Sequence, residues 1–300
     1  MTLKLFLIFV AALNVFIGVN LWRISPGLRV DVLDVGQGDA ILLTTPEDHH
    51  ILIDAGPDAK VLTELGEVLP PAFRELDLVV LTHPHLDHLA GLIPVLERFE
   101  VGALLISGAA YDSEAYSYFL DQVQGFDGSV YFATADTDFR FGSVMLDVLY
   151  PFINEVGQTF EEPNNSSLVI KAAWEDFSIL LTGDAEKEVE AELLAAWEAG
   201  EIDLEADVLK AGHHGSDSSS TPEFLEAVDA DWVLISCGMD NSYGHPHQVT
   251  LDKAAAQGMT VFRTDLEGRI SVTFGESESF YSWIRSIFAP RERSFSSSRS

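Results

Sequence analysis

The feature that most constrains the fold is a cluster of histidine and aspartate side chains directly after an apolar, β-branched run. The run covers residues 79–81, and His83, His85, Asp87 and His88 follow close behind it. An apolar stretch of helical composition, residues 89–96, comes next. This order predicts a buried strand, a tight loop and a helix, with the imidazoles and the carboxylate at the carboxyl end of the strand, where open α/β sheets place their sites.

The spacing of these side chains indicates two cation sites. His83 and His85 alternate along the chain, so their rings can converge on one cation, whereas Asp87 and His88 lie further round the turn and suit a second. Imidazole nitrogen and carboxylate oxygen bind zinc at about 2.0–2.2 Å, and the same ligands accept manganese or iron. Two such ions about 3.5–4 Å apart can activate a water and stabilise both oxygens of a displaced phosphate ester. The plainer alternative, a solvent-exposed histidine-rich turn, fits the position after a buried strand poorly.

Carboxylates end two further apolar runs. Asp54 follows residues 51–53, and Asp184 follows residues 177–182. Asp184 stands where a bridge between two cations is wanted. Asp54 either orients a ligand histidine from behind or is an ordinary residue of a turn.

Seven of the nine histidines fall in only three loops, and each loop follows an apolar strand. Besides the first cluster, these are His213 with His214, and His245 with His247, which flank a proline. This placement favours contact with metal or substrate over chance. Adjacent residues in an extended loop face opposite ways, so we expect one of the first pair to bind metal and the other to face substrate. The second pair suits phosphate contact or general-acid catalysis, with a structural turn as the rival interpretation.

Neutral polar side chains occupy two of these loops. Asn164, Asn165 and Ser166 precede an apolar strand, and Asn241 lies in the loop of the last histidines. Near a metal pair such donors can hold a bound oxyanion, although they also cap and turn chains. The chain has neither a G-x-S-x-G elbow nor a glycine-rich phosphate loop with lysine, so serine catalysis and P-loop nucleotide hydrolysis are not supported.

Composition and charge limit the class of partner. With 300 residues, 47% of them hydrophobic and 22% charged, the chain is globular and can bury a large core. Asp plus Glu number 48 against 17 for Lys plus Arg, and the net charge is −31. Such a surface repels nucleic acid at long range, so a phosphodiester substrate would need metals and a few local bases to attract it. The single cysteine, Cys237, excludes an internal disulfide and a cysteine-based zinc site.

The first 24 residues form the most apolar segment of the chain. Residues 3–22 carry only one charge, on Lys4, and a helix of that length reaches about 30 Å, enough to span a bilayer. We expect a membrane anchor over residues 1–24, a hydrolase domain over 25–280 outside the cytoplasm of a bacterium, and a disordered Ser- and Arg-rich tail over 281–300. A cleaved signal segment of a secreted protein is the alternative, and a buried core helix is the third possibility.

The signature at residues 83–88 resembles that of the metallo-β-lactamase superfamily. Six further motifs, at residues 33–40, 54–56, 164–169, 182–184, 210–216 and 241–247, look like the ordered motifs of one branch. That branch is the hydrolase domain of the ComEC family, the DNA-uptake channels of natural competence. The resemblance covers residues 28–275 and implies an α/β, four-layer αββα sandwich with metals at the edge between two similar halves.

Carried over position by position, the resemblance implies two divalent metal ions, Zn²⁺ or Mn²⁺. It assigns one ion to His83 and His85, the other to Asp87, His88 and one of His213 and His214, and the bridge to Asp184. The histidine that many superfamily members supply before the bridging aspartate is replaced here by residues 164–166. The first metal is therefore left with fewer protein ligands.

The resemblance implies a metal-dependent nuclease acting on the DNA strand that is not taken up. Asp87, His245 and His247 are the expected catalytic residues. The channel has many membrane helices and this chain has at most one, so we expect DNA or another phosphodiester as substrate and a separate uptake channel as partner. The alternatives are a metallohydrolase of a small ester, lactone or β-lactam, and a non-catalytic accessory subunit of an uptake machine.

Overall fold

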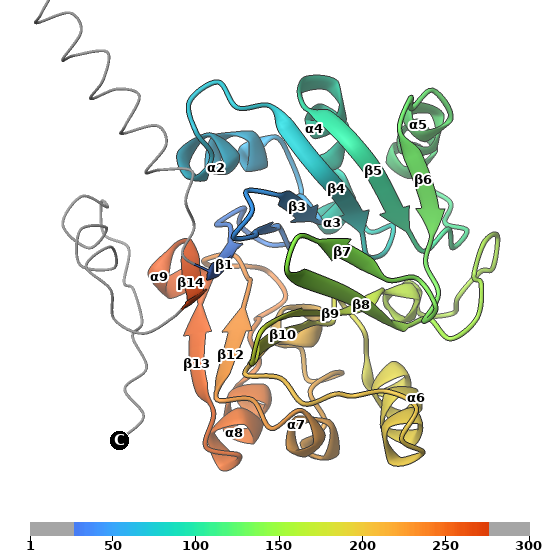
Figure 1. Cartoon of the computed structure of the whole chain (residues 1–300). Coiled ribbons are helices and arrows are strands. Elements are labelled where there is room, and N and C mark those ends of the chain that lie inside the picture. The colour runs from blue at the N-terminus through green and yellow to red at the C-terminus, as the bar shows by residue number, and fades with distance from the viewer. Residues whose placement is uncertain (1–26, 276–300) are drawn as a thin grey trace, which may run out of the picture.

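Two seven-stranded sheets face each other in the computed structural model, which describes residues 27–275 (Figure 1). The first sheet has the order β14-β1-β2-β3-β4-β5-β6 and the second the order β13-β12-β11-β10-β9-β8-β7. The strands of the first sheet are β1 (Gly27–Val32), β2 (Ile41–Thr44), β3 (His50–Ile53), β4 (Glu75–Leu81), β5 (Glu100–Ile106), β6 (Ser129–Phe132) and β14 (Ile270–Gly275). Those of the second are β7 (Phe139–Phe141), β8 (Val144–Tyr150), β9 (Val169–Trp174), β10 (Phe177–Leu181), β11 (Val208–Lys210), β12 (Trp232–Ile235) and β13 (Thr260–Arg263).

Helices cover the outer face of each sheet (Figure 1). The first sheet carries α2 (Lys60–Val68), α4 (Leu92–Arg98) and α5 (Glu114–Gln124), and the second carries α6 (Lys187–Glu198), α7 (Pro222–Val228) and α8 (Gln248–Ala256). Two short helices, α3 (Leu86–Leu89) and α9 (Thr264–Glu267), follow the ends of β4 and β13. The expected α/β arrangement of two sheets with covering helices is confirmed.

The period of two along each strand produces these layers. In β4, Leu78 and Val80 belong to the core between the sheets, whereas Val79 and Leu81 pack under the helices of the first sheet. In β10, Ile179 and Leu181 likewise face the first sheet, while Leu180 packs under the helices of the second sheet. Each such side chain contributes roughly 1.5–3 kcal/mol by its burial, and strands buried on both faces read as the continuous apolar runs seen in the sequence.

Parallel pairing brings the polar loops to one edge of the molecule. Strands β3 to β6 are parallel to one another, and so are β10 to β13. The loops that leave their carboxyl ends therefore lie on one side of each sheet. The last strand, β14, pairs antiparallel with β1 and returns the chain to the first sheet.

The predicted anchor over residues 1–24 and the predicted tail over residues 281–300 lie outside the described residues. Between Gly27 and Gly275, none of the helices combines the length and the apolar composition that a bilayer crossing requires.

A carboxyl pair at the edge of the second sheet gives a first prediction. Burial, together with a hydrogen bond and charge repulsion from Asp138, raises the pKa of Asp147 to about 6, and Lys171 counters this only in part. Because the pKa in the folded chain exceeds the ordinary 3.8, the unfolded chain loses the proton first as the pH rises. Stability contributed by the protonated carboxyl is thus lost as the pH rises through the folded pKa.

We expect Asp138→Asn to raise the melting temperature at about pH 8 by about 2–4 °C, for a gain of about 1 kcal/mol after solvent screening. At about pH 4 the gain should nearly vanish, because Asp147 is then protonated in the folded chain. Circular dichroism melting of the full chain at both pH values measures this. Asp136→Asn, an exposed neighbour, is the control, and an equal gain at both pH values would refute the account.

Candidate metal centre

The carboxylate of Asp184, directly after β10, lies among histidines from both halves of the chain. Its Oδ1 is 3.3 Å from Nε2 of His88, and its Oδ2 is 3.4 Å from Nε2 of His214. The same Oδ2 is 3.8 Å from Nε2 of His83, and Oδ2 of Asp87 is 3.3 Å from Nε2 of His214. Two ligand atoms about 2.1 Å from a tetrahedral ion lie about 3.4 Å apart. His88, Asp184 and His214 are therefore spaced as groups around one cation, and Asp87 lies against the same nitrogen of His214.

The ligand atoms of this cluster lack other partners. Nε2 of His83, His88 and His214, and Oδ1 of Asp184, are buried and accept or donate no hydrogen bond within residues 27–275. Leaving one buried polar group unpaired costs about 1–3 kcal/mol, so several together in one place require an explanation. Divalent cations would satisfy these atoms, and nitrogen and oxygen donors suit such ions.

His88 is held by a carboxylate behind it. Oδ2 of Asp54 accepts from Nδ1 of His88 at 2.7 Å and from the Thr82 hydroxyl at 2.7 Å. Its Oδ1 accepts from the Thr82 amide at 2.8 Å. Because Nδ1 carries the proton, the lone pair of Nε2 points to the centre, which is the usual way a metal-binding histidine is oriented.

His214 is oriented by two acceptors on its other side. Its Nδ1 lies 3.0 Å from the Ser236 carbonyl oxygen and 3.2 Å from Oδ1 of Asp39. Asp39, His88, Asp184 and His214 can place ligand atoms within 4.8 Å of one another. Because Asp39 meets Nδ1 of His214 and the other carboxylates meet Nε2, we assign Asp39 to orienting the ring rather than to binding the ion.

Asp39 and its buried partner Lys210 were missed as site residues from the sequence. Nζ of Lys210 lies 2.6 Å from Oδ2 of Asp39, and both side chains are almost fully buried. Burial opposes the charge on Asp39, but Lys210 and His214 lower its pKa to about 2. The available signal was a carboxylate directly after the glycine turn of residues 36–38. Gly38 has φ +137° there, and a Cβ on it would come within 2.1 Å of the Asp87 carbonyl oxygen.

The site is strongly polarised. Burial would raise the pKa of Asp184, but His214 and His88 beside it hold that pKa well below its ordinary value. Burial likewise opposes protonation of His88, yet Asp184 and Asp54 raise its pKa well above the ordinary value. Protons on the imidazoles and a metal ion compete for the same carboxylates, so metal binding should release protons.

Comparison with known proteins shows the family of the chain. Residues 33–239 match the model of the metallo-beta-lactamase superfamily. The chain belongs to this superfamily.

Similar proteins include ComE operon protein 3 of Bacillus subtilis, 31% identical over 82% of this chain and 33% of the relative. Competence protein ComA of Neisseria gonorrhoeae is 29% identical over 82% of this chain and 32% of the relative. The chain thus spans about a third of the length of these curated relatives. Among solved structures, the diiron β-hydroxylase CmlA of Streptomyces venezuelae has a TM-score of 0.56 at 17% identity, covering 83% of this chain and 54% of that one. The expected resemblance to ComEC-like proteins is confirmed.

The other two histidines of the superfamily signature are His83 and His85. His83 is fully buried, with Nδ1 3.2 Å from the Thr82 hydroxyl. The ring of His85 packs 4.8 Å from that of His83 and 5.3 Å from that of Tyr111. No sequence pattern pointed to Tyr111, whose contact depends on how the loop after β5 folds.

His213 and His214 do not form the extended loop that we expected. Both adopt left-handed backbone conformations, with φ values of 47° and 53°. His214 is buried against Asp184, whereas Nδ1 of His213 lies 3.0 Å from Oε1 of Glu186. Nε2 of His213 also lies 3.9 Å from Oδ2 of Asp184, the oxygen that Nε2 of His214 approaches at 3.4 Å, so the two rings do not face opposite ways.

His245 and His247 lie in the loop between β12 and α8. The His245 ring packs 5.3 Å from that of His213, and its Nδ1 is buried without a partner among the described residues. Burial first, and then the charges of His214 and His213, lower its pKa to about 4. His247 instead accepts from the Asp217 amide at Nδ1, 3.0 Å away, and its Nε2 lies 3.3 Å from the Tyr243 carbonyl oxygen. The His247 ring therefore links its own loop to the loop that contains His213, His214 and Asp217.

The neutral residues are mostly engaged within their own loops. Asn241 donates to the carbonyl oxygens of Gly238 and His245, and Ser166 donates to that of Pro163. The side chains of Asn164 and Asn165 donate to Glu186 and Glu188, respectively. Oδ1 of Asn164 is buried and accepts no hydrogen bond in the described part of the chain. Asn164 therefore has an acceptor that a ligand can use. Ser167, which we did not predict, accepts from the Asp184 amide at 3.0 Å.

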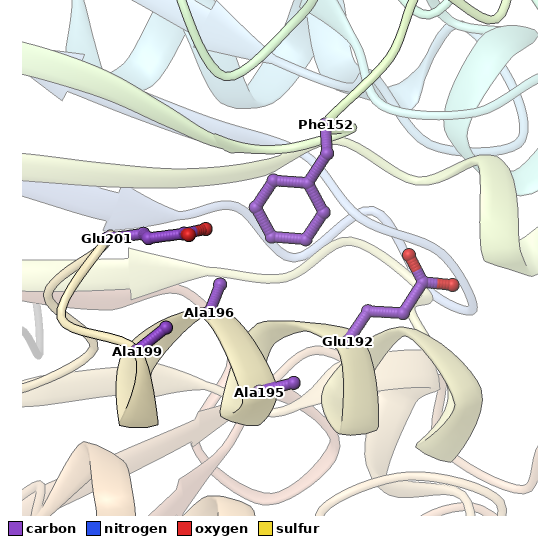
Figure 2. Close-up of a pocket in the computed structure, with 6 residues that line it drawn as sticks. All are labelled: Phe152, Glu192, Ala195, Ala196, Ala199 and Glu201. Carbon is purple, nitrogen blue, oxygen red and sulfur yellow. The ribbon is translucent and has the colours of Figure 1, made fainter.

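A separate pocket of about 330 Å³ lies between Phe152 and the outer face of α6 (Figure 2). Its floor is made by Ala195, Ala196 and Ala199, and the Glu192 and Glu201 carboxylates flank it. None of the residues of the metal centre lines this pocket, so its chemistry and that of the centre are distinct.

The contact from Asp54 to His88 gives a second prediction. In Asp54→Asn, an amide group can face Nδ1 of His88, which then carries the lone pair and leaves the proton on Nε2. We expect the affinity for Zn²⁺ to fall about 10–100-fold. Competition with a chromophoric chelator measures this, and Asp252→Asn on α8, an exposed aspartate, should bind as the parent does. Unchanged affinity in Asp54→Asn would show that Asp54 does not orient His88.

The buried pair of Asp39 and Lys210 gives a third prediction. Lys210→Met leaves the Asp39 carboxylate buried without its counter-ion, and we expect the free energy of unfolding to fall by about 3–5 kcal/mol. Adding Asp39→Asn should recover part of the loss. Lys60→Met removes a lysine from an exposed pair with Asp34 and should cost at most about 1 kcal/mol. Urea unfolding of the full chain measures all three, and equal losses in both lysine variants would contradict the argument.

Proposed function

We propose that the chain is a binuclear metal-dependent hydrolase that cleaves phosphodiester bonds in DNA. The observation that carries this proposal is the Asp184 carboxylate, which lies between imidazoles of both halves with its ligand atoms unsatisfied. A carboxylate in that position can bridge two cations, and two Zn²⁺ or Mn²⁺ ions supply an activated water and charge neutralisation for an in-line displacement.

The chain's own residues divide the work. We assign Asp87, His88 and His214 to one cation, His83 and His85 to the other, and Asp184 to both. Asp54 and Asp39 fix the rings of His88 and His214 by holding their Nδ1 atoms. Rigid ligands of this kind keep the reacting groups aligned, which contributes to the rate without further movement.

The substrate side is formed by His245 and Asn164. His245 Nδ1 and Asn164 Oδ1 are buried and unpartnered among the described residues, and the His245 ring lies against that of His213. His245 Nδ1, when it carries the ring proton, can donate to a phosphate oxygen, and Asn164 Oδ1 can accept from a bound water. His247, whose ring is bonded to its own loop, would act by positioning His245.

The names of the relatives support DNA as the substrate. ComE operon protein 3 and competence protein ComA share 31% and 29% identity with this chain. A separate DNA-uptake channel is the partner that we propose, because one relative is named a competence protein. The apolar residues 1–24 would anchor the domain to the bacterial membrane, with the centre outside the cytoplasm.

The net charge of −31 favours one rival, a metallohydrolase of a small ester, lactone or β-lactam. A small neutral substrate escapes the long-range repulsion that a nucleic acid meets. Both functions would use the same centre, so the substrate must be tested directly.

We expect the full chain, loaded with Zn²⁺ or Mn²⁺ in mild detergent, to cleave bis(p-nitrophenyl) phosphate and linear DNA. Single-stranded and double-stranded DNA, compared side by side, show which form is preferred. Asp87→Ala should lower both rates more than about 100-fold, because it removes a ligand and not only its support. His49→Ala, a histidine paired with Asp77 away from the centre, is the control.

Chelation should abolish cleavage and added metal should restore it. Cleavage that persists in Asp87→Ala would assign the activity to another site or a contaminant. Two bound ions without phosphodiester cleavage, but with hydrolysis of p-nitrophenyl acetate or a chromogenic β-lactam, would favour the small-ester function. Two bound ions and no hydrolysis would leave the accessory subunit.

A further inference from the structure

His213 and His83 are placed alike around the Asp184 carboxylate. Nε2 of His213 lies 3.9 Å from Oδ2 of Asp184, and Nε2 of His83 lies 3.8 Å from the same oxygen. His214, in contrast, approaches Oδ2 of both Asp184 and Asp87. Both neighbouring histidines thus approach the same Asp184 oxygen, and His214 approaches Asp87 as well.

The left-handed backbone explains how adjacent residues reach these positions. His213 and His214 have positive φ values, 47° and 53°, and both lie in one short turn, Gly212–Gly215. Non-glycine residues seldom occupy this region, and such strain is found at sites where the surrounding structure requires it. Here it brings both rings to the same carboxylate from one turn.

Nδ1 of His213, the ring nitrogen that points away from Asp184, lies against a carboxylate, as Nδ1 of His88 does. Its Nδ1 lies 3.0 Å from Oε1 of Glu186 and 3.1 Å from Oγ of Ser218. The Ser218 hydroxyl and the Asn164 amide each donate to the same Glu186 oxygen at 3.0 Å. Glu186 therefore relates to His213 as Asp54 relates to His88: a carboxylate accepts from Nδ1–H and leaves the Nε2 lone pair facing the centre.

We infer that His213 supplies the third imidazole of the first cation site, together with His83 and His85. The inference rests on the binuclear centre of the proposed function. Asp184 contributes Oδ2 to this site, and Glu186 is a positioning residue. The two histidines of the pair then bind different ions, so neither is left to face the substrate alone.

This assignment explains how the first cation can be held without a histidine from residues 164–166. Asn164 lies beside His213, with Nδ2 3.3 Å and 3.4 Å from its two ring nitrogens. It supports the Glu186 carboxylate rather than replacing the imidazole. Three imidazoles and one carboxylate oxygen would give Zn²⁺ four protein ligands, and the water of the proposed function would be a fifth ligand.

The test is metal stoichiometry, which does not depend on activity. The full chain is stripped with a chelator and dialysed against buffered free Zn²⁺, and bound zinc is counted by mass spectrometry. We expect two ions per parent chain and one per chain in His213→Ala at a free zinc concentration that just saturates the parent. Glu186→Gln should bind the same second ion about 10–100-fold more weakly.

His49→Ala is the control, because this histidine pairs with Asp77 away from the centre. It should keep two ions. Cobalt substitution adds a spectroscopic check: the visible absorption of one of two Co²⁺ sites should disappear in His213→Ala and weaken in Glu186→Gln. Melting of the metal-free proteins shows whether each variant folds.

If both His213→Ala and Glu186→Gln bind two zinc ions with parental affinity, the inference is overturned. His213 would then be assigned to the substrate instead of to a metal ion. Should His213→Ala fail to fold, the change in affinity of Glu186→Gln decides alone. A parent chain that binds fewer than two ions would overturn the binuclear centre and the inference together. A parent that binds two ions and cleaves no phosphodiester would overturn the proposed function and leave the assignment of His213 standing.

Discussion

The Asp184 carboxylate is the contact on which the rest of the site depends. It belongs to the second half of the chain, yet His83 and His88 of the first half lie against its two oxygens. The centre therefore forms only when the halves pack in register. Polar contacts between the halves set that register: Lys210 pairs with Asp39, and the Ser236 hydroxyl donates to the Gly38 carbonyl oxygen. Core packing brings the sheets together, and these few contacts specify which loops meet.

The fold was largely predictable because each strand carries its own apolar pattern. The strands that hold the site, β3, β4, β10, β11 and β12, all read as apolar runs ending in a polar residue. The strands β6, β7, β13 and β14 were not predicted. β6 is largely exposed and β7 is very short, while β14 depends on pairing with the distant β1. Local periodicity reports burial, and these strands owe their existence to their neighbours instead.

The site was predictable as a set of loops and much less so as a set of roles. A polar side chain in such a loop can face the centre or hold its own backbone, and composition is the same in both cases. The side chains of Asn241 and His247 hydrogen-bond to backbone groups of the surrounding loops. Asn164, in contrast, keeps a buried Oδ1 without a partner among the described residues, and its side chain lies near His213. Asp39 escaped notice for the opposite reason. Its partners Lys210 and His214 are far away in sequence, and only the packed halves bring the three together.

The acidity of the chain is compatible with a phosphodiester substrate because charge acts locally. Surface charges are screened within about 8 Å at physiological ionic strength, while a bound divalent ion is the largest charge in its surroundings. Described basic side chains such as Lys60, Lys171 and Arg263 already pair with carboxylates, and Lys210 is buried against Asp39. Attraction of a phosphate would then come from the loaded centre itself. A substrate held at one phosphate, and not along an extended basic groove, follows from that arrangement, as does a weak dependence of binding on salt.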